Sequence, residues 1–503
     1  MPTLGAIDIG SNAMRMAVGF LDARKQLQVV EDLREPVRLG QDVFTRGTLS
    51  RATVSRMIQA LIRFRVVLEA HRVEKTRAVA TSALREAKNR EAVLKRIRQA
   101  TGLEIDLISP EEEALLVQMA VSEKIPLWNR TALLVDVGGG SVEVTLVKHG
   151  RIAATESFHM GSVRLLKILE GEKTGERKFN RMVQEYAEAA RRRIQEKFGK
   201  RPVDLCVGTG GNLDALGDLR LQLLHGPDSA SFSRKDLGEL VRRLQRSTLN
   251  DRISRLHMRP DRADVILPAA LVVQKLMEAA KVRRVLTPHV GLKEGILRNL
   301  VPEFLTGRPA THRAEILTSA AQLGQRYRYD EPHADRVARY AMELFDKTRK
   351  LHRLEEDDRL LLEVAAKLHD IGQYVNYGSH HKHSYYLIRA SHLVGLNVQQ
   401  EELVANVARY HRKSPPKMKH DNYRTLAPSL RSRVIRMSAL LRVADAMDYE
   451  HAGKVQSFRV ETGPRRFSLR LHGTGDLALE KWSLLRKCDL FEKTFKTHLT
   501  VKG

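Results

Sequence analysis

The chain has 503 residues, 42% of them hydrophobic, which is enough for about three or four domains with substantial cores. Its 86 Lys and Arg outnumber its 60 Asp and Glu, and the net charge of +26 favours a polyanionic partner, whereas an aromatic content of only 5% disfavours nucleic acid. No stretch approaches the about 20 apolar residues of a membrane span, and Cys206 and Cys488 fit no disulfide or metal spacing, so we expect a cytoplasmic protein that binds no membrane.

From the N-terminus, residues 1–300 alternate between strand-like and helix-like patterns, which is typical of an α/β domain. The expected strands are 4–10, 13–20, 76–80, 103–108, 131–137, 142–147 and 203–207. The expected helices are 51–71, 111–122, 175–198, 234–246 and 262–281. Pro302, Gly307 and Pro309 indicate a linker. Residues 312–450 have an almost wholly helical pattern, apolar residues alternate again from about 455, and a further helix is expected from 476.

Two segments of the α/β region repeat one short pattern. Residues 6–15 (AIDIGSNAMR) and 134–143 (LVDVGGGSVE) each hold an apolar strand that ends in Asp, then x-Gly, small residues and a second strand. Three residues align pairwise between the copies: Asp8 with Asp136, Gly10 with Gly138, and Arg15 with Glu143. Small residues let the backbone approach a ligand, and the amides of such a turn can point together at an anion. Two facing hairpins would hold a phosphate chain from both sides, whereas a single copy could be an ordinary hairpin turn.

With four further motifs, the chain resembles the exopolyphosphatase / guanosine pentaphosphate phosphohydrolase family over essentially its whole length. These motifs are residues 80–89 (ATSALREAKN), 112–114 (EEA), 161–165 (GSVRL) and 208–212 (GTGGN). The resemblance implies an α/β fold of two duplicated actin-like (ribonuclease H-like) ATPase-superfold domains, then an all-α HD-like domain and a small C-terminal α/β domain. The expected boundaries are 1–125, 126–305, 312–450 and 455–503. Ala13 stands where the family usually has Ser or Thr, so we expect the first loop to rely more on backbone donors.

Members of this family hydrolyse a terminal phosphoanhydride with water and Mg²⁺, and the resemblance implies that Glu113 is the general base. Ser109, Pro110 and Glu112 read as N-cap, first residue and third residue of a helix with a capping box, which leaves Glu113 free. On the pattern alone, a first-turn Glu commonly complements the helix dipole.

Three carboxylates are the expected Mg²⁺ site. Asp136 and Glu143 are the expected ligands, and Asp8 would help through water, because Mg²⁺ usually takes one or two carboxylates with phosphate oxygens and waters. The alternative for Glu143 is a solvent-facing strand residue, since Val142 and Val144 alternate with it.

Small residues and cations of the motifs are expected to bind phosphate: Gly10, Ser11, Asn12, Arg15, Arg85, Gly138, Gly139, Gly140, Ser141, Gly208, Thr209 and Gly210. Arg85 suits a clamp because its planar fork can bind phosphate with two hydrogen bonds. The alternative for Arg85 is an ion pair with Glu86 or a neighbour.

The helical segment carries a second set of ligand-type residues. His333, His369-Asp370 and Asp445 reproduce the H…HD…D order of HD-type metal phosphohydrolases and share helix faces with apolar residues. Buried His and Asp need partners, and a divalent metal would satisfy them together. Four other histidines could supplement the set: His380, His381, His383 and His411. Two alternatives remain for these residues: a site that binds a metal, and a structural remnant of such a site that is held together by hydrogen bonds.

The expected function is an exopolyphosphatase, a homodimer that releases terminal orthophosphate from inorganic polyphosphate in a cleft between the actin-like halves. The alternatives are hydrolysis of guanosine pentaphosphate to the tetraphosphate at the same site, a polyanion-binding or sensing protein without turnover, and an actin-like kinase. Intact Glu113, Asp136 and Glu143 disfavour the sensor. The resemblance to kinases stops at the phosphate loops.

Overall fold

The computed structural model describes residues 3–23, 26–171, 203–225, 228–306, 313–391, 393–463 and 465–502, with isolated positions between 181 and 193. The chain divides into two compact units, Met1–Thr311 and His312–Gly503, and each has its own core. The helix expected at 175–198 lies almost entirely outside the described residues, as do Gly307 and Pro309 of the expected linker. No helix among the described residues is long and apolar enough to cross a membrane.

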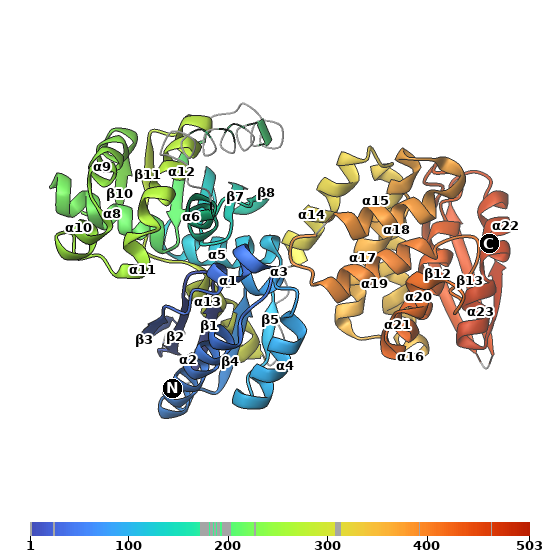
Figure 1. The fold of residues 1–503 in the computed structure, drawn as a ribbon. Helices are drawn as coiled ribbons and strands as arrows, with labels where there is room; N and C mark the ends of the chain where they lie inside the picture. The colour runs from blue at the N-terminus through green and yellow to red at the C-terminus, as the bar shows by residue number, and fades with distance from the viewer. Residues whose placement is uncertain are drawn as a thin grey trace. The chain divides into compact units, whose positions relative to one another are not determined.

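The first unit contains two mixed sheets, and the first sheet has five strands (Figure 1). They are β1 (Thr3–Ile9), β2 (Met14–Leu21), β3 (Leu27–Glu35), β4 (Lys75–Ala80) and β5 (Ile105–Leu107), in the order β3-β2-β1-β4-β5. Strand β1 is buried at almost every position, as expected for a central strand covered on both faces. The four strands expected here are confirmed. The pattern missed β3, because most of its side chains are polar and at least partly exposed.

The second sheet repeats the order of the first and adds one strand at its edge. Its strands are β6 (Thr131–Val137), β7 (Val142–Lys148), β8 (Arg151–Phe158), β9 (Leu205–Thr209), β10 (Ser231–Ser233) and β11 (Arg284–Leu286). The order β8-β7-β6-β9-β11 matches β3-β2-β1-β4-β5, and β10 pairs antiparallel with β11. This duplicated order is that of the ribonuclease H-like halves of actin-like proteins, so the predicted fold class is confirmed.

Helices pack around both sheets. They are α1 (Leu39–Arg46), α2 (Arg51–Ala70), α3 (Ser82–Glu86), α4 (Arg90–Thr101), α5 (Pro110–Lys124), α6 (Ser162–Gly171), α8 (Gly211–Leu224), α9 (Arg234–Arg246), α10 (Leu249–Ser254), α11 (Pro260–Ala263), α12 (Ile266–Ala279) and α13 (Leu292–Thr306). Helix α13 returns to the first sheet and packs on β1 and α5.

The single helix expected at 262–281 is confirmed only in part, because the structure has two helices there. Helix α11 ends at Ala263 and α12 begins at Ile266. In one continuous helix, Pro268 would lie in the interior, where its ring clashes with the carbonyl of Asp264 and its missing N–H breaks a hydrogen bond. Starting at Ile266 places Pro268 in the first turn, where proline is tolerated.

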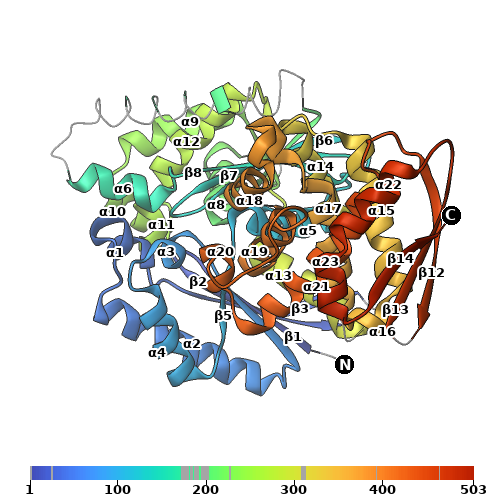
Figure 2. The same cartoon turned by 90° about the vertical axis from the view of Figure 1, so that its right-hand side faces the viewer.

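The second unit is a helical bundle that continues into a small sheet (Figure 2). Its helices are α14 (Arg313–Arg326), α15 (Glu331–Lys347), α16 (Arg349–His352), α17 (Glu356–Leu368), α18 (His380–Ala390), α19 (Val398–Arg409), α20 (Asp421–Arg424) and α21 (Pro428–Ala446), with 3-10 turns at Ile371–Tyr374 and Tyr377–Ser379. The tail adds β12 (Val455–Gly463), β13 (Arg466–Gly473), α22 (Ala478–Lys487), α23 (Asp489–Phe495) and β14 (His498–Lys502). Helix α23 packs on α21, and the sheet and the helices share one apolar core.

Candidate active site

The two repeated segments fold into the same tight turn. In the first, between β1 and β2, the amide of Gly10 donates to the carbonyl of Ala13 at 3.1 Å. In the second, between β6 and β7, the amide of Gly138 donates to the carbonyl of Ser141 at 3.1 Å. Since the bond uses the carbonyl of residue 13, Ala13 preserves the turn without the hydroxyl that the family usually has there.

The two turns face each other closely. A Cβ atom added at Gly139 would lie 3.1 Å from Cβ of Ser11, and one added at Gly140 would overlap Oγ of Ser82. Ser11 and Ser82 are joined by a hydrogen bond of 2.9 Å between their hydroxyls. Glycine is therefore needed in the second turn to let the backbones approach.

Backbone amides of both turns border a cavity of about 90 Å³. The carbonyls of the second turn are engaged by the start of α6: the amides of Gly161, Ser162 and Val163 donate to Gly140, Gly138 and Gly139 at 3.2, 3.0 and 2.9 Å. Within the described part of the chain, the amides of four turn residues donate to no other residue: Ser11, Asn12, Gly139 and Gly140. Converging amides of this kind form an anion-binding concavity.

Four carboxylates lie at this cavity or just beneath it. Burial raises the pKa of Asp8 to about 6, against the opposing effect of Arg15, and burial also raises the pKa of Asp136. Burial, reinforced by Asp136, raises the pKa of Glu143 to about 7. Only 3% of Glu143 is exposed, so it is not a solvent-facing strand residue. Its Oε1 accepts a hydrogen bond of 3.0 Å from Ser157 Oγ.

Glu113 lies in the first turn of α5. Burial and then the charge of Glu143 raise its pKa well above the ordinary range, and its buried Oε2 has no hydrogen-bond partner among the described residues. Nη1 of Arg85 lies 4.0 Å from this oxygen. The same Nη1 donates to the carbonyl of Ile108 at 2.6 Å, which holds Arg85 beside Glu113 and outside the lining of the cavity.

One prediction from the sequence is wrong, and one alternative is excluded. Ser109 is the N-cap of α5 and accepts from the amide of Glu112 at 3.2 Å, but the carboxylate of Glu112 binds Arg77 Nη2 at 2.6 Å and closes no capping box. Glu86 does not pair with Arg85, because both of its oxygens bind Nη2 of Arg164 at 2.8 Å.

Only part of the 208–212 motif lines the cavity. Gly208 packs against Leu213 and Val285 in the core, and the hydroxyl of Thr209 donates to Asp136 Oδ2 at 2.8 Å. Neither borders the cavity, whereas Gly210, with φ of 81°, does. The remaining predicted phosphate-binding residues that line it are Gly10, Ser11, Asn12, Arg15, Gly138, Gly139, Gly140 and Ser141.

The sequence reading missed Arg262. Its guanidinium is almost fully buried at the cavity, donates from Nη1 to Asn212 Oδ1, and converges with that of Arg15 on Gly211. Burial and the neighbouring Arg15 and Arg34 lower the pKa of Arg262 to about 9. Nothing in the pattern distinguishes this arginine from the other basic residues, since the chain has 86 Lys and Arg.

A larger cleft of about 720 Å³ adjoins the cavity and shares Arg15, Gly211 and Arg262 with it. Its basic lining residues are Arg15, Arg34, His257, Arg259, Arg262, His289 and Lys293, and its acidic ones are Asp32, Asp214 and Asp218. Anions bound in the small cavity can therefore extend into a mostly cationic space.

A family model described as the Ppx/GppA phosphatase family matches residues 20–304. The chain belongs to this family. A second model, Ppx/GppA phosphatase domain III, matches residues 317–493. The family identifies the chain as a hydrolase of phosphoanhydride bonds, and its members typically depend on a metal.

Curated relatives of the Ppx/GppA family cover most of the chain. Proteins named guanosine-5'-triphosphate,3'-diphosphate pyrophosphatase are 28% identical in Vibrio vulnificus, over 82% of this chain and 81% of the relative, and 28% identical in Aeromonas salmonicida, over 80% and 79%. The crystal structure of the Aquifex aeolicus Ppx/GppA family member is 25% identical, with a TM-score of 0.51, over 61% of this chain and 99% of that one. An exopolyphosphatase from Cytophaga hutchinsonii shares the fold at 23% identity, with a TM-score of 0.56, over 60% and 98%.

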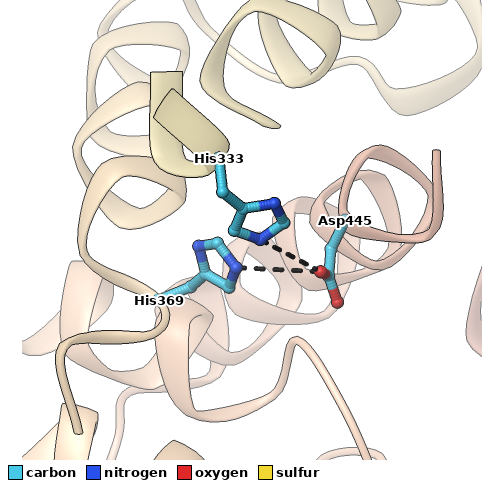
Figure 3. Close-up of side chains that lie close together, drawn as sticks. All are labelled: His333, His369 and Asp445. Carbon is cyan, nitrogen blue, oxygen red and sulfur yellow. Dashed lines mark ion pairs between the residues drawn. The ribbon is translucent and has the colours of Figure 1, made fainter. Parts of the chain in front are cut away.

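In the domain III part of this family member, the second predicted set of ligands comes together. Figure 3 shows His333 and His369 turned toward Asp445, at 3.8 and 3.7 Å from its Oδ1. His369, Asp370 and His411 form a second group that could hold a metal ion, and His333, Asp370 and His451 form a third, whose His451 the sequence did not predict. His380 lies 3.0 Å from Asp370 Oδ1, although none of these groups includes it, and His381 and His383 are in none of them either.

Proposed function

We propose that the chain releases terminal orthophosphate from inorganic polyphosphate in the small cavity between the two turns. The observation that carries this proposal is that hydrogen-bond donors for phosphate and a carboxylate that can act as a base lie at the same cavity. Unpaired amides of Ser11, Asn12, Gly139 and Gly140 can hold phosphate oxygens, and Glu113 lies at the same cavity with an unpartnered carboxylate oxygen.

In this proposal Glu113 takes the proton of the attacking water. The water oxygen bonds to the terminal phosphorus, the anhydride P–O bond breaks, and the shortened chain leaves with the electrons of that bond. Because burial makes Glu113 a stronger base than an exposed glutamate when it is ionised, the residue suits this task. Arg85, held by the carbonyl of Ile108, keeps a positive charge near Glu113 and favours its ionised form.

The carboxylates of Asp136 and Glu143, with Asp8 through water, would hold Mg²⁺. They fit that ion because they offer hard oxygens and because burial leaves their negative charge without enough cationic partners, as their raised pKa values show. When bound, Mg²⁺ neutralises charge on the anhydride and on the leaving phosphate.

The adjoining cleft would hold the rest of the polyphosphate chain. Arg15 and Arg262 lie where the cleft meets the cavity, and Arg34, Arg259 and Lys293 continue the positive lining. Guanidinium groups bind phosphate oxygens with strong, charge-assisted hydrogen bonds.

Guanosine pentaphosphate is the second candidate substrate, and one side chain favours it. Asp214 lines the cleft, and its buried Oδ1 has no hydrogen-bond partner among the described residues, with Nδ1 of His289 at 3.6 Å. A carboxylate repels a bare polyphosphate but can accept hydrogen bonds from ribose hydroxyls or from the guanine ring. The names of the curated relatives also point to guanosine pentaphosphate as the substrate.

The test is orthophosphate release from long polyphosphate, tripolyphosphate and guanosine pentaphosphate, measured side by side in the parent and in Asp214→Asn. We expect polyphosphate to be cleaved most efficiently, and the variant to cleave it at least as well as the parent. A guanosine pentaphosphate preference that Asp214→Asn removes would support the second candidate instead. Phosphate release from none of the three would refute both.

A further inference from the structure

The domain III part of the chain gathers four histidines and two aspartates from separate elements. His333 lies on α15, His369-Asp370 follows α17, His380 begins α18, His411 follows α19, and Asp445 lies near the end of α21. All four histidines are at least 97% buried on the side chain, whereas Asp370 and Asp445 keep 13% and 10% of theirs exposed. The cluster is therefore buried but reaches solvent at its carboxylates.

The four imidazoles share one orientation. Nδ1 of each ring lies at hydrogen-bond distance from an acceptor: His333 from Asp448 Oδ2 at 2.7 Å, His369 from the carbonyl of Ala366 at 2.7 Å, His380 from that of Tyr377 at 3.0 Å, and His411 from that of Ala408 at 2.7 Å. These acceptors fix the tautomer in which Nδ1 carries the proton and Nε2 offers a lone pair. Metal-binding histidines are held in this way by their second hydrogen bond.

The lone pairs face carboxylate oxygens, which are also acceptors. Buried Nε2 of His333, buried Nε2 of His369 and buried Oδ1 of Asp370 have no hydrogen-bond partner among the described residues. Acceptors that face each other in a buried site need a cation between them.

The distances divide the ligand atoms into two sets. Nε2 of His380, Nε2 of His411 and Oδ1 of Asp370 are 3.2, 3.0 and 3.4 Å apart. Atoms bound at about 2.1 Å to one ion lie roughly 3.0–3.4 Å apart in octahedral or tetrahedral geometry. In the second set, Nε2 of His333 and Nε2 of His369 lie farther from their carboxylate, at 3.8 and 3.7 Å from Asp445 Oδ1. Asp370 reaches this set too, with Oδ1 at 3.7 Å from His369 and Oδ2 at 4.0 Å from His333.

We propose that this cluster binds two divalent cations that share Asp370. His380 and His411 would complete one ion's ligands, and His333, His369 and Asp445 those of the other. Paired metal sites commonly hold their ions about 3.5–4 Å apart, a spacing that one bridging carboxylate can span. Imidazole-rich ligands favour zinc, iron, copper or nickel over Mg²⁺, so this centre differs chemically from the carboxylate site of the first unit.

The charge around the pair points to a phosphate-bearing ligand. Two ions would bring four positive charges to two coordinating carboxylates. Lys487 Nζ lies 2.6 Å from Asp445 Oδ2, and Nη1 of Arg412 lies 3.3 Å from His380 Nε2. This excess of positive charge, at a site open to solvent through Asp370 and Asp445, would attract a phosphate group to the remaining coordination positions.

The test measures zinc bound to the full chain after metal depletion, zinc reconstitution and desalting, with millimolar Mg²⁺ present to occupy hard-oxygen sites. We expect two zinc ions per chain in the parent and in His472→Gln, which changes an exposed histidine away from the cluster. His411→Gln and His333→Gln should each retain one ion, and Asp370→Ala should lose at least one. Thermal unfolding verifies that each variant is folded. No stoichiometric zinc in the folded parent, or a single ion lost alike in both histidine variants, overturns the two-ion centre.

Inorganic phosphate tests the ligand. Calorimetric titration of the zinc-loaded parent should show a phosphate-binding component that Asp370→Ala lacks, over and above any binding in the first unit. Identical phosphate titrations for the two proteins would show that the cluster does not bind phosphate. The number of bound zinc ions would then still test the two-ion centre.

Discussion

At the residue scale, Arg262 is a buried arginine that lines the cavity proposed to bind phosphate. Replacing it by glutamine removes a guanidinium that converges there with Arg15. A hydrogen bond to a charged group contributes about 1.5–3 kcal/mol, so KM for polyphosphate should rise roughly 10- to 100-fold with a smaller change in kcat. Arg259→Gln, at an exposed position of the adjoining cleft, is the matched control and should change KM less. Equal effects of the two variants would argue against a special place for Arg262.

Glu143 should make the stability of the first unit depend on pH. Its folded-state pKa of about 7 exceeds the ordinary value of 4.5, so between these values the folded protein binds a proton more tightly than the unfolded chain. The parent should therefore lose stability relative to Glu143→Gln as pH rises from about 4.5 to 7, by roughly 1–3 kcal/mol in metal-free protein. Thermal unfolding at pH 5 and pH 8 measures this difference, and added Mg²⁺ should reduce it.

The control is Glu104→Gln, at an exposed position. Its difference from the parent should be the same at both pH values. A Glu143→Gln difference that is also independent of pH would mean that the carboxylate is ionised at neutral pH without a metal.

The sequence predicted Glu143 and missed Arg262 for a physical reason. Glu143 aligns with Arg15 in a repeated strand-turn-strand pattern, and a repeat of this kind can be recognised in the sequence. Arg262 reaches the cavity from a short helix far along the chain, and only the folded backbone brings it beside Asn212. The hydrogen bond from the side-chain amide of Asn12 to the carbonyl of Asp261 also joins distant parts of the chain, so the sequence could not predict it.

At the scale of elements, the second turn depends on glycine. Gly140→Ala would push a methyl group into Ser82 and Phe44, so it should destabilise the first unit by about 1–3 kcal/mol and lower the rate of phosphate release. Gly238→Ala is the contrasting change, because Gly238 lies inside α9 with only Gln274 Nε2 within 4 Å, at 3.8 Å. It should stabilise the protein by roughly 0.5–1 kcal/mol and leave the rate unchanged. Thermal unfolding and initial rates measure both.

Strongly patterned elements were predictable, and those shaped by tertiary contacts were not. Strands β1 and β6 are apolar almost throughout and end at the Asp-x-Gly motif, so both were found with small errors at their ends. β10 and β11 have three residues each and take their register from neighbouring strands, which leaves too few residues for a period to show. β14 was absorbed into the helix expected from 476, although it pairs with β13.

At the scale of the whole molecule, the net charge of +26 should make the binding of long polyphosphate strongly dependent on salt. Each contact with a long polyanion releases counterions, so its KM should rise more steeply with ionic strength than that of tripolyphosphate. A folded fragment ending at Thr306 retains the proposed site and should still cleave short substrates, with weaker binding of long chains. Initial rates at several salt concentrations measure how KM for each substrate depends on salt. Equal salt dependence in the fragment and the full chain would mean that the charge of the second unit does not contribute to binding long polyphosphate.

Homodimerisation also belongs to this scale and stays a prediction. If the second unit supports it, the full chain should sediment as a dimer and the fragment as a monomer. Analytical ultracentrifugation of the two proteins decides this, and a monomeric full chain would contradict the prediction.

The most direct test of the account is the rate of orthophosphate release from saturating polyphosphate by Glu113→Gln and Glu112→Gln. The two glutamates are neighbours in the first turn of α5, but Glu113 lies at the cavity and Glu112 binds Arg77. Loss of the general base should slow Glu113→Gln by roughly 10²–10⁴-fold while polyphosphate binding persists, and Glu112→Gln should stay close to the parent rate. A folded Glu113→Gln protein that keeps more than about a tenth of the parent rate would contradict the assignment of Glu113 as the base.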